Sequence, residues 1–146
     1  MIQGLPNSQM MSEKTSLSLE SAYETCRKET AQWAKTFYLG TLLLPPIKRR
    51  AIWAIYVWCR RTDELMDSPE AMKCPTNELA KRLDQWESRT KAMFDGQVED
   101  ELDAVMTDTL KRFPQSMQPY LDMIEGQRMD LHKTRYATFD ELALYC

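Results

Sequence analysis

The sequence has few glycines and a single histidine, and both shortages limit its fold and its chemistry. Glycine accounts for 4 of 146 residues, and no segment shows the alternation of apolar and polar residues that is typical of a β-strand. The four cysteines form no CxxC pair, and His132 is the lone histidine. A zinc site therefore has almost no thiolate or imidazole ligands to draw on. Because long helical patterns could build a core without disulfides, we expect a protein of a reducing compartment.

The sequence also lacks a long apolar run and an excess of basic residues. The densest apolar run, residues 51–59, is far shorter than the roughly 20 residues of a membrane span, so it predicts a buried core helix. Nineteen basic and 22 acidic residues give a net charge of −3, and nucleic-acid binding is not expected. Residues 1–18 have no apolar stretch of the kind found in a secretory signal, and we expect them to form a flexible leader.

Apolar residues recur at helical spacing along the rest of the chain, which predicts an all-α protein with one helical domain over residues 19–146. Together with the prolines, this spacing predicts helices at about residues 19–37, 47–67, 77–94, 102–113 and 118–133. The second is apolar on nearly every side, so we expect it to be central. On the last, the face predicted to be buried consists of Tyr120, Met123, Ile124, Gln127 and Leu131.

The final residues contain the start signal of a further helix. Thr138 and Glu141 have the spacing of a capping box, which predicts that a new helix opens there. A helix of about two turns gains little, because nucleation is costly and its packing partners would be missing. We therefore expect the chain to be truncated, the N-terminal part of its domain.

Two carboxylates on the central helix, Asp63 and Asp67, point to metal chemistry. They lie four residues apart, about 6 Å along the helix axis. Like charges in this relation repel, and burial beside the apolar run raises the cost further. A divalent cation, Mg²⁺ or Mn²⁺, would remove the conflict, with substrate phosphates completing its coordination. The same spacing recurs on polar stretches that we interpret as solvated faces: Glu20/Glu24, Asp95/Glu99 and Glu99/Asp103.

Arg60 and Tyr56 precede these aspartates by one and two turns on the same helix face. A guanidinium beside a metal-binding pair is suited to grip phosphate oxygens in a bidentate fashion. Tyr56 would face an apolar cavity, and Phe37 fits a core position. The alternative interpretation is that Arg60 pairs with Glu64 and that both aspartates face water.

The segment WAIYVWCRRTDELMD, from Trp53 to Asp67, resembles the first aspartate-rich motif of the squalene/phytoene synthase family. Two flanking segments, AKTFYLGTLLLP at residues 34–45 and GQRMDLHKTRYATFDELALYC at residues 126–146, resemble the phytoene-forming branch of that family. The resemblance covers nearly everything after residue 18, with three motifs in the order that the family has.

This resemblance implies an isoprenoid-synthase helical fold and a head-to-head prenyl transfer. Two geranylgeranyl diphosphates would condense to prephytoene diphosphate and then to phytoene, a step of carotenoid biosynthesis. The metal would be Mg²⁺ or Mn²⁺ held through the substrate diphosphate, and NADPH would not be needed. The long substrate tails suggest peripheral contact with a membrane. The compartment would be the cytoplasm in a bacterium and the plastid in an alga or plant.

The resemblance also assigns roles to individual residues. Asp63 and Asp67 match the metal-binding aspartates, and Arg60 matches the diphosphate-binding arginine. Tyr145 matches a tyrosine close to the ionising diphosphate. The positions that match substrate contacts are Trp33, Ala34, Lys35, Thr36, Tyr56 and Asp130. Phe37 is added to them because its ring, like that of Tyr56, could stabilise the carbocation that this reaction forms in an apolar cavity.

The family pairs this motif with a second aspartate-rich motif on a later helix, and the 146 residues contain no second DxxxD on an apolar helix. We therefore expect no catalysis by these residues alone. Two alternatives remain. One is a squalene or dehydrosqualene synthase-like enzyme, which NADPH dependence would separate in the squalene case. The other is a non-catalytic helical binding or assembly relative, against which the intact Asp63, Asp67 and Arg60 argue.

Overall fold

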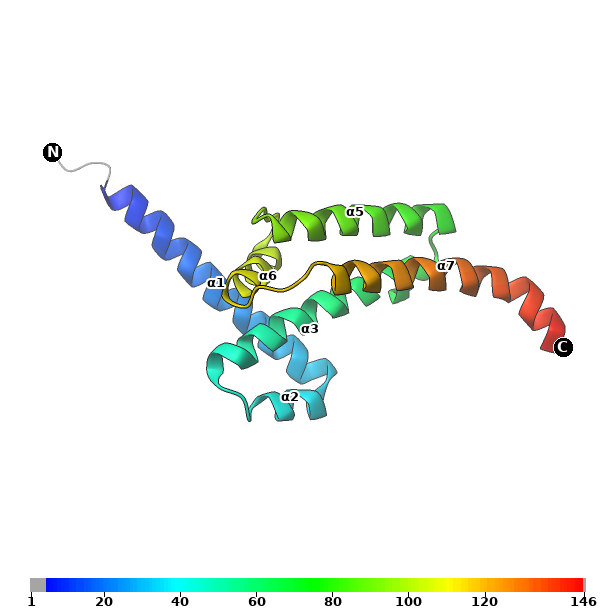
Figure 1. Ribbon diagram of the computed structural model, residues 1–146, viewed down its shortest axis with the longest axis horizontal. Helices are drawn as coiled ribbons and strands as arrows, with labels where there is room; N and C mark the ends of the chain where they lie inside the picture. Colours follow the sequence, from blue (N-terminus) through cyan, green and yellow to red (C-terminus); the bar gives the residue numbers. More distant parts are fainter. Residues whose placement is uncertain (1–4, 146) are drawn as a thin grey trace. The chain divides into compact units, whose positions relative to one another are not determined.

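The computed structural model describes the backbone of residues 5–145 and the side chains of residues 18–131. The described backbone is helical and contains no strand, which confirms the all-α prediction (Figure 1). Its elements are α1 (Leu5–Trp33), α2 (Lys35–Thr41), α3 (Pro46–Asp67), α4 (Pro69–Met72), α5 (Thr76–Phe94), α6 (Glu101–Arg112) and α7 (Gln118–Tyr145). Contacts divide the chain into two units: Met1–Trp58 with Gln97–Pro114, and Cys59–Gly96 with Gln115–Cys146.

Helix ends that coincide with proline or glycine agree with the prediction. Helix α3 ends at Asp67, and Ser68 then caps α4 by accepting a hydrogen bond from the Ala71 amide at 3.1 Å. Helix α5 ends before Gly96, whose φ of 88° lies in the left-handed region that favours glycine. Pro114 follows the end of α6.

Three predicted helix boundaries are wrong. Helix α1 begins at Leu5 rather than at residue 19, because no proline or glycine interrupts residues 7–33. Helix α7 continues to Tyr145, so no new helix opens at Thr138, and residues 127–145 likewise contain no breaker. The single helix predicted over residues 19–37 is divided at Ala34, where φ is −140° and ψ is 68°.

The first unit is built around α1, α3 and α6, and α6 packs against α1 (Figure 1). Its core consists of Ala22, Tyr23, Cys26, Trp53, Ala54, Val57 and Val105. The Tyr23 hydroxyl donates to Asp108 at 2.6 Å, which joins α1 to α6. Burial and this hydrogen bond raise the pKa of Tyr23 to about 12, so the phenol stays protonated at neutral pH.

Helix α2 is attached to α3 within the same unit. The Trp53 indole donates to the Thr41 hydroxyl at 2.8 Å, and Thr41 in turn donates to the Tyr38 carbonyl. The Tyr38 and Trp53 rings stack with centroids 5.7 Å apart. These contacts redirect the chain after Ala34, and they join residues too distant in sequence for helical periodicity to predict them.

In the second unit, α5 and α7 run antiparallel side by side (Figure 1). Arg128 on α7 binds Asp84 at 2.9 Å and Glu87 at 3.1 Å, both on α5. The Trp86 indole donates to the Thr62 hydroxyl at 2.8 Å, which fixes α5 to the last turns of α3. The predicted inner face of α7 is confirmed at Tyr120, Ile124 and Leu131, whereas Gln127 is only partly buried and Met123 is 39% exposed.

Replacing Thr41 by valine should destabilise the first unit. The change keeps the side-chain shape but removes the acceptor of the buried Trp53 indole, which costs about 1–3 kcal/mol. Urea unfolding of Thr41→Val, followed by circular dichroism, measures this loss. Thr25→Val is the matched control, because Thr25 is exposed and bonds only to the Ser21 carbonyl in its own helix. Equal stability of the two variants would contradict a structural role for the Trp53–Thr41 bond.

Candidate functional site

The last two turns of α3 carry the predicted aspartate pair in the second unit. Asp63 is partly buried, and its Oδ1 accepts a hydrogen bond from Gln127 Nε2 on α7 at 2.9 Å. Asp67, one turn later, is exposed. The helix places both carboxylates on one face, as the spacing predicted.

The surroundings of Asp63 disfavour its charged form. Burial raises the pKa of the Asp63 carboxyl, and the negative charge of Asp67 adds to that rise. Arg60 and the Gln127 amide act in the opposite direction without cancelling it. A cation shared by the two carboxylates would remove this conflict.

The donor set fits a metal ion that a substrate helps to hold. Among residues 18–131, no group of three or more His, Cys, Asp or Glu side chains gathers around a common point. Two carboxylates cannot form a complete protein cage for Mg²⁺, but Mg²⁺ is commonly held by one or two carboxylates while phosphate oxygens and water complete its shell. Asp63 and Asp67 therefore suit a metal–diphosphate complex better than a bare ion.

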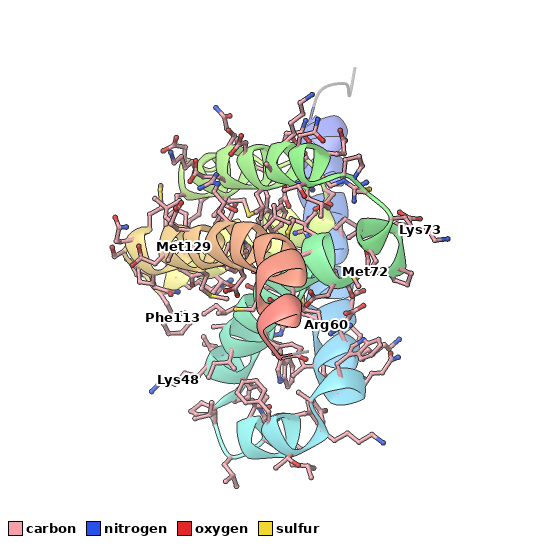
Figure 2. All side chains as sticks on the ribbon, turned by 90° about the vertical axis from the view of Figure 1, so that its right-hand side faces the viewer. Lys48, Arg60, Met72, Lys73, Phe113 and Met129 are labelled. Carbon is pink, nitrogen blue, oxygen red and sulfur yellow. The ribbon has the colours of Figure 1, made fainter. Side chains whose placement is uncertain are left out.

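Arg60 lies one turn before Asp63 on α3 (Figure 2). One of its terminal nitrogens is 3.2 Å from Glu64 Oε1, so the ion pair of the alternative interpretation is present. The Glu64 side chain is 53% exposed, and an ion pair so open to water contributes little to the stability of the fold. A diphosphate, with more charge and more oxygens, would compete well for the guanidinium.

The first unit holds the predicted substrate residues around the α1–α2 break, together with Tyr56. Trp33 and Phe37 flank the break at Ala34 and are 52% and 47% exposed, so neither is a core residue. The Phe37 and Tyr56 rings lie 5.7 Å apart, tilted by 32°. Lys35 and Thr36, on the first turn of α2, are exposed. The structure thus brings the two aromatic residues together and leaves the polar pair open to solvent.

Two predicted site residues lie on α7, Asp130 near its middle and Tyr145 at its last position. Asp130 is exposed, and the Tyr145 side chain lies outside the described residues. Gln127 was not predicted as a site residue, yet it contacts Asp63 directly. A polar residue among apolar ones on the face predicted to be buried was the signal that could have identified it.

Replacing Asp63 by asparagine should stabilise the fold at neutral pH. A carboxyl whose pKa is raised on folding favours the folded state below its ordinary value of 3.8, and this contribution is lost as the pH rises through the raised pKa. Asp63→Asn should therefore unfold at higher urea concentration than the parent at pH 7, and the difference should shrink as the solution is acidified.

The control is Asp122→Asn, because Asp122 is exposed and accepts the Gln118 amide on its own helix at 2.8 Å. The urea midpoint of Asp122→Asn should stay close to that of the parent at pH 7 and in the acidified solution. An Asp63→Asn variant less stable than the parent at pH 7 would show that the site does not strain this carboxylate.

Solved structures of known proteins share this arrangement of helices. The structure of a dehydrosqualene synthase in complex with a ligand superimposes with a TM-score of 0.67 and 26% identity, over 80% of this chain and 39% of that chain. A squalene synthase from Alicyclobacillus acidocaldarius gives a TM-score of 0.67 over 78% of this chain. The fold is the isoprenoid-synthase helical fold, as predicted.

Sequence comparisons are more specific. The 15-cis-phytoene synthase of Synechocystis sp. is 58% identical over 135 residues, which are 92% of this chain and 39% of that protein. The chloroplastic phytoene synthase of Daucus carota is 56% identical over 128 residues, 88% of this chain and 31% of that protein. The chain thus spans between about a third and two-fifths of the length of these relatives.

The family model for squalene/phytoene synthases matches residues 30–146. This range includes α3 with Arg60, Asp63 and Asp67, and α7 with Gln127. The chain therefore belongs to the squalene/phytoene synthase family.

Proposed function

We propose that this chain serves the head-to-head condensation of two geranylgeranyl diphosphates to phytoene, by way of prephytoene diphosphate, in carotenoid biosynthesis. The observation that carries the proposal is the pair Asp63 and Asp67 on one face of α3 with Arg60 one turn away, in a chain 58% identical over 135 residues to a 15-cis-phytoene synthase. Two like charges one turn apart repel, and the partial burial of Asp63 adds to that cost unless a cation is bound.

In this proposal Asp63 and Asp67 hold Mg²⁺ or Mn²⁺ together with the substrate diphosphate. The metal, when bound, supplies positive charge where the departing diphosphate becomes more negative. Arg60 donates to the same phosphate oxygens from the neighbouring turn, and its planar fork orients the group. Both effects act on charge that develops in the transition state, so they accelerate ionisation as well as binding.

The remaining proposed contacts come from the residues around the α1–α2 break and from α7. In this proposal the diphosphate would also be contacted by Trp33, Ala34, Lys35 and Thr36. The Phe37 and Tyr56 rings, which lie against each other, would stabilise the allylic cation through their faces. Asp130 and Tyr145 are proposed as substrate-binding and catalytic residues respectively, on the resemblance alone.

The second candidate is a squalene or dehydrosqualene synthase-like enzyme, favoured by the structural similarity to a dehydrosqualene synthase. The identity to that structure, 26%, is less than half the identity to the relative from Synechocystis. We therefore favour phytoene as the product and expect no NADPH requirement. The proposed compartment follows the source: the cytoplasm in a bacterium and the plastid in an alga or plant.

A product assay with geranylgeranyl diphosphate and Mg²⁺ tests the proposed function. It is run on the chain alone and on a chimera in which the Synechocystis relative supplies the sequence after its aligned region. The chimera should form phytoene without NADPH. Arg60→Lys in the chimera should lower turnover at least ten-fold, about 1.4 kcal/mol of transition-state binding, because lysine cannot make the bidentate contact.

The control is Arg82→Lys, a basic residue on α5 outside the proposed site, which should leave turnover unchanged. A chimera that makes no phytoene, or that converts its substrate only with NADPH, would contradict the proposed reaction. An Arg60→Lys chimera with the parent's turnover would return Arg60 to the role of an ion-pair partner of Glu64.

We also propose that the first unit contacts a membrane surface through the turn between α2 and α3. Leu39 of α2, Leu43 in the turn and Ile47 of α3 are 64%, 89% and 57% exposed. Lys48, next in sequence to Ile47, extends away from the ribbon (Figure 2). Residues 30–58 contain four basic residues and no acidic one, although one of the four, Arg50, pairs with Glu20 of α1. Exposed apolar side chains with a basic rim favour an anionic lipid surface. No described helix is long and apolar enough to cross a membrane.

Leu43→Asn should weaken binding to phosphatidylglycerol-containing vesicles about ten-fold, because one exposed leucine contributes on the order of 1.5 kcal/mol when it leaves water. Vesicle flotation measures the bound fraction. Met72→Asn is the control, since Met72 on α4 is 74% exposed but far from any such cluster in sequence (Figure 2). Equal losses in the two variants would contradict docking through this turn.

A further inference from the structure

Gln127 is the one side chain of another helix that the structure shows bonded to the predicted metal-binding aspartates within residues 18–131. Its Nε2 donates to Asp63 Oδ1 at 2.9 Å across 64 residues of sequence. Both side chains are partly buried. A hydrogen bond shielded from water holds its partners more firmly than an exposed one.

Two neighbouring residues of α7, Arg128 and Tyr120, hold this part of the helix in place. Arg128, the next residue after Gln127, binds Asp84 and Glu87 on α5. Tyr120 packs its ring edge-on against Phe94 of α5, with centroids 5.5 Å apart. Because Tyr120 and Arg128 hold α7 on either side of Gln127, the Gln127 amide stays at one position relative to α3 within this unit.

An amide is chemically suited to orient a metal-binding carboxylate. A carboxylate has about four lone-pair sites, and one amide donor occupies a single one of them, which leaves the others for a cation. A lysine or arginine at this position would neutralise the charge and compete with the metal. Gln127 carries no charge, so it restricts the rotation of the Asp63 side chain without displacing an ion.

We propose that Gln127 is a positioning residue that holds the Asp63 carboxylate ready to share a divalent cation with a diphosphate, an inference that rests on the proposed function. Residues that hydrogen-bond a metal ligand in this way commonly contribute 10- to 100-fold to metal affinity. Gln127 would act through Asp63, not by contact with the substrate.

The test is Mn²⁺ binding by the 146-residue chain in the presence of inorganic diphosphate, with free Mn²⁺ followed by electron paramagnetic resonance. Gln127→Met, which keeps the length of the side chain and removes the donor, should raise the Mn²⁺ dissociation constant about 10- to 100-fold. Gln127→Leu should do the same and serves as a second variant if the first folds poorly. Circular dichroism confirms that each variant is folded.

Gln118→Met is the matched control, since it removes the same kind of bond, from Gln118 Nε2 to Asp122 Oδ1 at 2.8 Å, on the same helix. It should change Mn²⁺ affinity by less than about two-fold, within the scatter of independent sites. In an Asp63→Asn background, Gln127→Met should have no further effect, because the positioned carboxylate is gone.

The outcomes separate the positioning role from the proposed function. If Asp63→Asn weakens Mn²⁺ binding and Gln127→Met leaves it within about two-fold of the parent, the positioning role alone is overturned. The same holds if Gln127→Met weakens binding equally with and without Asp63, because its effect would then be structural. If Asp63→Asn binds Mn²⁺ as the parent does, the metal site itself is overturned, and the role of Gln127 with it.

Discussion

The burial of Asp63 beside a second carboxylate is the constraint on which the rest of this site depends. Three contacts set its environment. Thr62, the preceding residue, accepts the Trp86 indole from α5, so the turn of α3 that carries Asp63 is fixed from one side. Gln127 of α7 donates a hydrogen bond to the Asp63 carboxylate itself. Arg128 then ties α7 to α5 through Asp84 and Glu87. Helices α3, α5 and α7 thus form a closed set of contacts around one charged group.

This arrangement lowers the stability of the folded protein when the Asp63 carboxyl is ionised. The raised pKa of Asp63 means that folding disfavours its ionised form, which is the form that a metal ion requires. A neutral asparagine would fit the same space with less strain. Retention of the aspartate is understandable if the folded state acquires a cation and a diphosphate, because binding to the folded state returns free energy to it.

Much of the fold could be predicted from the sequence, because proline or glycine lies at or just after several of the helix ends. The end of α3 at Asp67, the glycine after α5 and the proline after α6 are local signals. The errors fall where such signals are missing or misleading. Helix α7 continues past Thr138 because a capping box does not interrupt a helix whose backbone bonds can continue.

The site was predictable only in part, for the same physical reason. Asp63, Asp67 and Arg60 share one helix, so their spacing records their common face. The contact between Gln127 and Asp63 joins two helices, and no local periodicity encodes it. The aromatic pair Phe37–Tyr56 and the bond from Trp53 to Thr41 likewise depend on how α2 returns to α3. These three features depend on contacts between helices, which the spacing of residues within one helix cannot predict.

The most direct test of the account is the position of the metal. Crystals of the chain grown with Mn²⁺ and inorganic diphosphate would reveal Mn²⁺ by its anomalous scattering. The account predicts a peak at coordination distance, about 2.1 Å, from carboxylate oxygens of Asp63 and Asp67, with diphosphate oxygens on its other side and Arg60 on the same phosphate. Mn²⁺ found only at exposed acidic residues elsewhere, such as Glu99, with Asp63 still bonded to Gln127 alone, would contradict it.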